Sequence, residues 1–217
     1  MPDAKKLNII GLLSGLIALG MGIGVGVLTA RYYSPVEQPP GIQGMFWPDP
    51  KQLYPFLTVD DTGARFGLDR LKGKWSFMFF GYTHCPDVCP ITLSVMAQVH
   101  EKLQRQGLGG EVQMLFVTVD PERDTTRRLA KYVHKFDSAI IGLGGSMTQI
   151  QSLTGQLGVL SVKDETDEHG NYLVDHSTAL FLIDPKGRLI SLFSAPHDAE
   201  SIVSRFLRIR DFVGQQA

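Results

Sequence analysis

The chain has only two cysteines, Cys85 and Cys89, which lie four residues apart in the segment THCPDVCP at residues 83–90. The pair follows an apolar run, residues 75–82, and precedes a stretch with helical periodicity that begins at Ile91. Two thiols at this spacing suit soft-metal binding, reversible disulfide chemistry, or both. A static disulfide is the competing interpretation, but so small a ring constrains little of the unfolded chain. Two cysteines alone cannot complete a tetrahedral zinc site.

A metal site needs a third ligand, and the six histidines are the candidates. His84 adjoins Cys85, so its side chain should point away from the thiols. His176 differs from the others because it leads directly into an apolar strand, Thr178 to Ile183. Its position alone leaves it one candidate among several. Surface, turn, packing or capping roles are expected for the remaining four, which are His100, His134, His169 and His197.

The position of the thiols in the fold favours reactivity. Cys85 falls where a strand turns into a helix, and Pro90 suits the first turn of that helix. Backbone N–H groups and the helix dipole at this point favour a thiolate, which lowers the pKa of the thiol. Cys89, four residues later, can bring its sulfur to the same side. The pair can therefore chelate one ion or close a small disulfide ring.

The composition excludes some classes of function and indicates a membrane anchor. A net charge of −1 gives no reason to expect nucleic acid as a partner. Leu7 to Ala30 carries no charge, and at 1.5 Å per residue it is about 36 Å long, enough to cross a bilayer core. This length exceeds the apolar region of a cleaved signal peptide, and a core helix is ill placed before a proline-rich stretch. We therefore predict an uncleaved transmembrane anchor at residues 7–30.

The flanks of the predicted anchor set its orientation. Lys5 and Lys6 outnumber Arg31, so residues 1–6 should stay in the cytoplasm and the rest should lie outside it. Residues 31–50 contain five prolines and should form an extended linker. Residues 51–217 are long enough for one domain with a hydrophobic core.

The periodicity of that domain alternates between strands and helices, which indicates an α/β fold: a central mixed sheet with helices on both faces. Asp124 is expected to cap a helix that runs to Phe136, and Ser146 to cap one that runs to Leu157. The predicted strands are residues 56–60, 66–68, 75–81, 112–119, 140–143, 178–183 and 189–193. The other predicted helices are residues 91–105 and 198–213.

Three ordered motifs together resemble the Sco/SenC family over about residues 50–212. They are GYTHCPDVCP at residues 81–90, VTVDPERDT at 117–125 and YLVDHS at 172–177. The resemblance implies a thioredoxin-like fold. The loop that faces the cysteines in such proteins usually carries a cis-proline, and residues 175–177 take its place here. That placement would put the imidazole of His176 opposite the two sulfurs.

The resemblance therefore implies a copper site made of Cys85, Cys89 and His176. Two thiolates suit Cu(I), three donors suit trigonal coordination, and an added water or carboxylate oxygen would allow Cu(II). Asp87 and Asp175 either tune this site or have capping and surface roles. Asp120 and Arg123 are expected to fix a strand-to-helix turn, and the acidic run at residues 164–168 either meets a basic partner or forms a solvated loop.

The predicted function is that of a copper metallochaperone rather than an enzyme. By resemblance, its client is the subunit that holds the binuclear copper centre of a respiratory cytochrome c oxidase, and an upstream copper donor or thiol reductant would load it. The chain would be a single-pass protein of the inner membrane with its domain in the periplasm, or facing the intermembrane space in a mitochondrion. The alternatives are a thiol-disulfide oxidoreductase, in which Cys85 attacks and Cys89 resolves, and a redox or copper sensor or peroxidase-like enzyme.

Overall fold

The structure, a computed structural model, describes residues 18–27, 47 and 49–215 of the chain. These residues fall in two units, and each is described by itself. In the first unit, residues 18–27 are helical. No helix among the described residues combines the length and the apolar character needed to cross a membrane. Most of the predicted segments 1–6, 7–30 and 31–50 lies outside the described residues, so these three assignments stay predictions.

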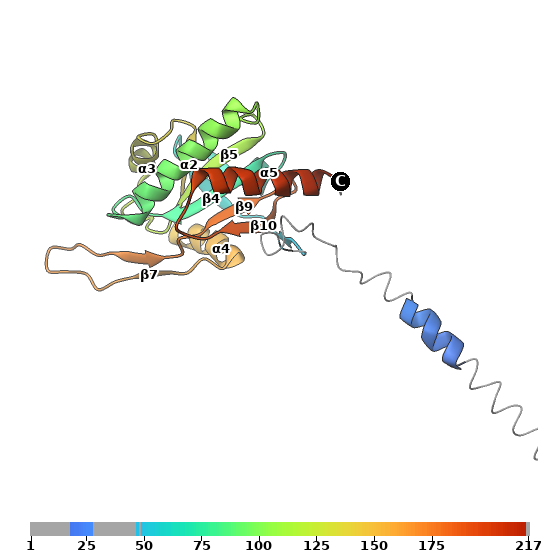
Figure 1. The fold of residues 1–217 in the computed structure, drawn as a ribbon. Helices are drawn as coiled ribbons and strands as arrows, with labels where there is room; N and C mark the ends of the chain where they lie inside the picture. The colour runs from blue at the N-terminus through green and yellow to red at the C-terminus, as the bar shows by residue number, and fades with distance from the viewer. Residues whose placement is uncertain (1–17, 28–46, 48, 216–217) are drawn as a thin grey trace, which may run out of the picture. The chain divides into compact units, whose positions relative to one another are not determined.

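An eight-stranded sheet in the order β1-β10-β9-β4-β5-β6-β2-β3 forms the centre of the second unit (Figure 1). Its three middle strands, β4 (Trp75–Gly81), β5 (Val112–Thr118) and β6 (Ile140–Gly144), are parallel. The others pair antiparallel, which confirms the predicted mixed sheet. They are β1 (Lys51–Gln52), β2 (Leu57–Asp60), β3 (Arg65–Gly67), β9 (Leu180–Ile183) and β10 (Arg188–Phe193).

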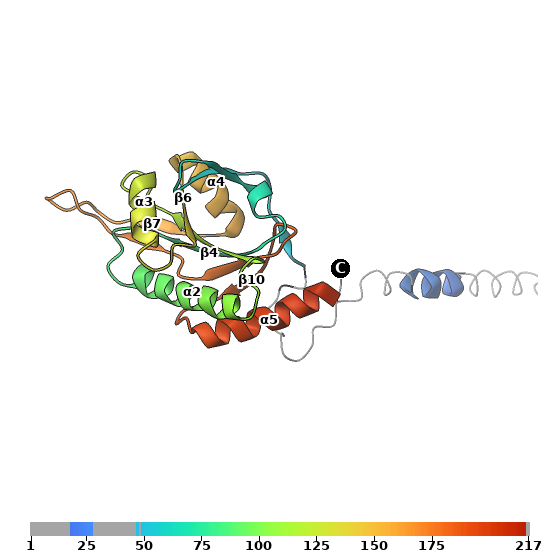
Figure 2. The same ribbon diagram turned by 90° about the horizontal axis from the view of Figure 1, so that it is seen from above.

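Helices cover both faces of this sheet, as predicted (Figure 2). The apolar residues of α2 (Val88–Arg105), α3 (Thr126–Val133) and α5 (Ala199–Gln215) form one core with side chains of β4 and β5. Those of α4 (Met147–Leu157) form a second core on the opposite face. A short 3₁₀ helix, η1 (Leu68–Arg70), follows β3.

Strand β4 leads into the loop that carries the two cysteines. All seven of its residues are buried, as expected for a parallel strand covered on both faces. Its last residue, Gly81, pairs with Thr118 at the end of β5. The cysteine loop and the segment that begins at Val119 therefore leave the sheet side by side, at the carboxyl ends of two neighbouring parallel strands, where sites of α/β proteins form.

One hairpin was not predicted. Strand β7 (Ser161–Lys163) pairs with β8 (Val174–His176) in a two-stranded sheet of its own. All three residues of β7 are exposed, so the strand has none of the alternation that marks a half-buried strand. Tertiary contacts at the base of the hairpin, described below, hold it instead.

The predicted cap of α3 was wrong. Thr125, not Asp124, is the N-cap, and its side chain accepts a hydrogen bond from the backbone N–H of Arg128. Asp124 is buried, and it accepts hydrogen bonds from the backbone N–H and the hydroxyl of Thr83 and from the hydroxyl of Thr118. This carboxylate therefore ties the cysteine loop to the end of β5 rather than capping the helix.

Replacement of Asp124 by Ala should lower the free energy of unfolding by about 3 kcal/mol, because three hydrogen bonds to a buried carboxylate are lost. Thr125→Ala is the matched control, since it removes only the cap and should cost about 1 kcal/mol. Urea denaturation of both variants measures the difference. A cost for Asp124→Ala no greater than that for Thr125→Ala would contradict the bridging role.

Candidate metal centre

The two cysteines occupy different environments at the start of α2. Cys85 lies in the loop after β4 and is partly exposed, and its backbone N–H donates to the carbonyl of Tyr82. Cys89 lies in the first turn of α2, is completely buried and remains a free thiol like its neighbour. Cys85 is thus the less buried of the two cysteines.

The sulfur of Cys89 packs directly against the backbone of β4 at Gly81. A Cβ atom at this position would stand only 2.6 Å from the Cys89 sulfur and 2.9 Å from the ring of Phe116. Only glycine permits this approach. This role of Gly81 was not predicted, although a glycine that ends an apolar strand just before a motif is a signal of close approach.

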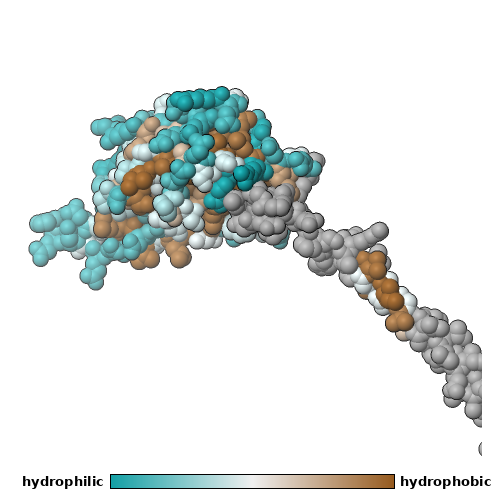
Figure 3. Space-filling model, in the orientation of Figure 1, coloured by the Kyte–Doolittle hydropathy of each residue, from teal (hydrophilic) through white to brown (hydrophobic). Residues whose placement is uncertain are grey.

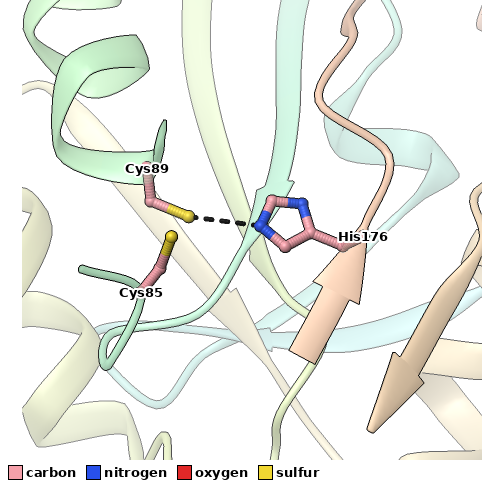
Figure 4. A group of neighbouring side chains, drawn as sticks. All are labelled: Cys85, Cys89 and His176. Atoms are coloured by element: carbon pink, nitrogen blue, oxygen red, sulfur yellow. Dashed lines mark hydrogen bonds between the residues drawn. The ribbon is translucent and has the colours of Figure 1, made fainter. Parts of the chain in front are cut away.

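His176 is the third member of the group. It ends β8, and its Nε2 atom lies 3.4 Å from the sulfur of Cys89 (Figure 4). The ligand atoms of Cys85, Cys89 and His176 all lie within 4.8 Å of one another. The Nδ1 atom of His176 lies 3.0 Å from the carbonyl oxygen of Ser177, which only accepts. Nδ1 is therefore the donor to this carbonyl, and Nε2 faces the sulfurs.

The other histidines lie away from the sulfurs. His84 lies beside Arg128, with 2.7 Å between its Nε2 and the guanidinium, in agreement with the prediction that it points away. His84 also joins a second potential ligand group with Asp120 and Asp124, but both carboxylates already accept hydrogen bonds from protein groups. Three more histidines have partners elsewhere in the domain: His100 contacts Asp137, His134 contacts Asp61, and His197 contacts the carbonyl of Thr178.

A cluster of side chains holds the hairpin that carries His176. Arg123 forms an ion pair with Asp120 and donates to the backbone carbonyl of Tyr172 at 3.0 Å. Its guanidinium lies 3.4 Å from the centroid of the Tyr172 ring, and the Tyr172 hydroxyl donates to Asp120 at 2.8 Å. The hydroxyl of Tyr82 adds one more tie by accepting from the backbone N–H of Val174.

The roles of the four polar residues considered in the sequence analysis can now be stated. Asp120 and Arg123 fix their turn, as predicted, since the N–H of Arg123 donates to the carbonyl of Asp120. The contacts of Asp120 and Arg123 with Tyr172 were not predicted, because the hairpin of β7 and β8 was not predicted. Within the described part of the chain, neither Asp87 nor Asp175 hydrogen-bonds His176. Asp175 is exposed, and Asp87 is the N-cap of α2 without a side-chain capping bond.

Hydrogen bonding and burial push the two thiols in opposite directions. The thiol of Cys89 donates a hydrogen bond to Cys85, and the side chain of His176 and the backbone N–H groups of Cys89 and Asp87 donate further ones. These bonds outweigh desolvation and lower the pKa of Cys85 to about 4. The hydrogen bond that the Cys89 thiol donates to Cys85, together with burial, raises the pKa of Cys89. At neutral pH the pair therefore carries one thiolate, on Cys85, the less buried cysteine.

Comparisons with known proteins agree with the motifs. A family model described as SCO1/SenC matches residues 49–210. The chain is 38% identical over 148 residues to Protein SCO1 homolog 1, mitochondrial, of Arabidopsis thaliana. This match covers 68% of this chain and 44% of that protein. It is 32% identical over 194 residues to SCO2-like protein RP587 of Rickettsia prowazekii, covering 88% of this chain and 94% of that one. The chain spans about half the length of the mitochondrial relatives that it matches.

A solved structure gives the same result for the fold. The crystal structure of Arabidopsis thaliana ScoI with copper bound superposes with a TM-score of 0.67 at 36% identity. The match covers 73% of this chain and 98% of that one. This likeness confirms the predicted mixed α/β fold. Copper, which the motifs led us to predict, is present in that relative.

The low pKa of Cys85 predicts how its alkylation depends on pH. In the reduced, metal-free protein, the rate with iodoacetamide should be nearly constant between about pH 6 and pH 8, because the thiolate fraction is already complete. Cys89→Ala removes the donor thiol and should make the rate rise with pH towards the ordinary cysteine pKa of about 8.5. Mass spectrometry of the alkylated peptide measures both rates. A wild-type rate that rises about tenfold per pH unit over this range would contradict the assignment.

Proposed function

Because this chain belongs to the SCO1/SenC family, we propose that it binds one copper ion and delivers it to the binuclear copper centre of a respiratory cytochrome c oxidase. Cys85 and Cys89 supply the sulfur ligands and His176 supplies a nitrogen ligand. The convergence of these three ligand atoms within 4.8 Å is the observation that carries the proposal. Copper is the cargo, and the protein is a metallochaperone rather than a catalyst that turns over.

The chemistry of the three donors fits copper. Two thiolates are soft ligands that favour Cu(I), and an imidazole serves both oxidation states. With bonds of about 2.3 Å to sulfur and about 2.0 Å to nitrogen, trigonal ligands stand roughly 3.7 Å apart. The 3.4 Å between the Cys89 sulfur and the His176 Nε2 is close to this spacing. Little movement is therefore needed to bring the donors onto one ion.

Delivery by ligand exchange follows from the unequal exposure of the two sulfurs. Cys85 is the more exposed ligand, so a thiolate or imidazole of the client can replace it first while Cys89 and His176 still hold the ion. Copper then passes to the client without a change of oxidation state. The proposed location follows from residues 7–30: a single membrane-spanning helix would hold the domain on the outer side of an inner membrane, where such a client is assembled.

The unequal exposure of the two cysteines also fits a second candidate, reduction of the client's copper-site cysteines. The Cys85 thiolate would attack a client disulfide, forming a mixed disulfide and releasing one client thiolate. Cys89, after losing its proton, would then attack the Cys85 sulfur and release the second client thiolate. The client gains two electrons, and Cys85 and Cys89 become a disulfide. An external thiol reductant would have to restore the pair.

His176→Ala separates the two candidates. Loss of the nitrogen ligand should weaken copper binding by at least about 100-fold, because even the loss of a supporting partner costs 10–100-fold. The two thiols should still form a disulfide with a dithiol standard. Competition with a Cu(I) chelator measures the binding, and oxidase assembly is measured in cells that carry the variant. The delivery role predicts that assembly fails.

Two results would count against parts of this proposal. Normal oxidase assembly in cells with His176→Ala, despite weak copper binding, would reject delivery and favour reduction. A reduced wild-type protein that takes up no stoichiometric Cu(I) would reject the site itself. His134→Ala is the matched control, because this exposed histidine contacts Asp61 and should leave copper binding unchanged.

Arg123→Ala should weaken Cu(I) binding by about tenfold, although Arg123 is not one of the proposed ligands. The variant frees Tyr172 and thereby the hairpin that presents His176. Arg123 acts only by positioning His176. A double variant with His176→Ala should therefore bind Cu(I) no more weakly than His176→Ala alone. Additive losses in the double variant would show instead that Arg123 acts independently of His176.

A further inference from the structure

Helix α3 and the residues just after it present a group of cations that the site does not use. The basic face consists of Arg127, Arg128, Lys131 and Lys135, all of them exposed. Within the described part of the chain, none of the four pairs with a carboxylate, and Arg128 contacts only the ring of His84. Elsewhere in the domain, many cations are paired, for example Arg188 with Asp184 and Arg210 with Glu111. Carboxylates of the described residues therefore do not neutralise the positive charge of the basic face.

The basic face surrounds a hollow of about 450 Å³ beside the cysteine loop. His84 and Tyr132 complete its wall with the four cations and two threonines, and no carboxylate among the described residues lines it. His84 is the immediate neighbour of Cys85. The hollow therefore adjoins the loop that carries Cys85, and Thr83 and His84 of that loop form part of its wall.

The opposite charge lies in the hairpin that carries His176. Asp164, Glu165, Asp167 and Glu168 are exposed in the arm that joins β7 to β8. Figures 1 and 2 place this arm and α3 at the same end of the domain, and Figure 3 shows the arm as a hydrophilic projection. The basic face of α3 and the acidic arm thus lie at the same end of the domain.

We propose that the basic face is a docking surface for an acidic segment of the protein that exchanges copper or electrons with Cys85. This inference rests on the proposed function, because it describes the partner of the same site. Carboxylates of the partner would meet the four cations, and basic residues of the partner would meet the acidic arm. Such a pattern both speeds the encounter and fixes the orientation of the two proteins.

The charge pattern favours a protein over a lipid surface as the occupant. An anionic membrane is negative throughout, so the acidic arm at the same end of the domain would repel it. The apolar residues of α3, Leu129 and Val133, are buried and offer no wedge for insertion into a bilayer. A protein can present both signs of charge over the distance between arm and helix.

The test uses the reduced full-length chain in non-ionic detergent and two synthetic peptides. Each peptide alternates glycine with either glutamate or lysine and ends in a cysteine joined to 2-thiopyridine. Attack by the Cys85 thiolate on the peptide sulfur forms a mixed disulfide and releases 2-thiopyridone, which is followed by absorbance. At about 20 mM salt, the acidic peptide should react at least about tenfold faster than the basic one, and about 500 mM salt should remove most of this difference.

A pair of charge reversals supplies the matched control. Lys131→Glu/Lys135→Glu should slow the acidic peptide about tenfold. Lys72→Glu/Lys74→Glu makes the same change in net charge at exposed residues before β4, about 20 Å of strand away from the cysteine loop, and should slow it by less than about twofold. Both variants keep Cys85, Cys89 and His176, so Cu(I) uptake should be unchanged and is measured separately from the peptide rates.

Three results would overturn the proposal. Equal slowing by both pairs of reversals would mean that only net charge matters. Suppression by inorganic phosphate beyond the effect of sodium chloride at equal ionic strength would assign the hollow to a small oxyanion. Suppression by a short-chain phosphatidylglycerol, but not by the matching phosphatidylcholine, would assign the face to lipid. A failure of Cu(I) uptake in the wild-type chain would reject the proposed function and leave the peptide rates to be judged by themselves.

Discussion

The arrangement of the site depends on one contact between distant parts of the chain. The imidazole of His176 lies 3.4 Å from the sulfur of Cys89, although 87 residues separate them. Cys89 is fixed by the sheet and by α2, but His176 ends a short strand outside the main sheet. Without other contacts, a two-stranded hairpin has little stability of its own. The position of the imidazole therefore depends on whatever fixes the hairpin to the domain.

That attachment explains why the polar motif after β5 lies beside the site. Asp120, Arg123 and Tyr172 satisfy one another's charges and hydrogen bonds at the edge of the domain. Since Arg123 is mostly buried and paired, its removal would leave the carboxylate of Asp120 without its charge partner. Asp124 performs a similar function for the cysteine loop through Thr83. Carboxylates of one segment thus hold both halves of the site in place.

The sequence predicted regular elements better than the contacts between them. Strand β4 and the hairpin of β2 and β3 were found because apolar runs and turn residues are local signals. The hairpin of β7 and β8 was not found, because its first strand is fully exposed and tertiary contacts hold it. Asp124 was wrongly predicted to be an N-cap because local sequence favours aspartate at that position. Its carboxylate instead accepts hydrogen bonds from the hydroxyl groups of Thr83 and Thr118. The family was recognised correctly from three motifs, whereas the closeness of Gly81 to Cys89 required coordinates.

The unequal thiols bear on the choice between delivering copper and delivering electrons. Stabilisation of the Cys85 thiolate stabilises the reduced pair, and a pair stabilised in this way accepts electrons more readily than it donates them. A thiolate of low pKa is also a weaker nucleophile than one whose pKa is near the ambient pH. Both effects work against a reductase. They favour a copper ligand, because a sulfur that has already lost its proton does not make the metal compete with H⁺. At the proposed location outside the cytoplasm, resistance to oxidation would also keep the pair available where a dithiol of ordinary potential would be lost as a disulfide.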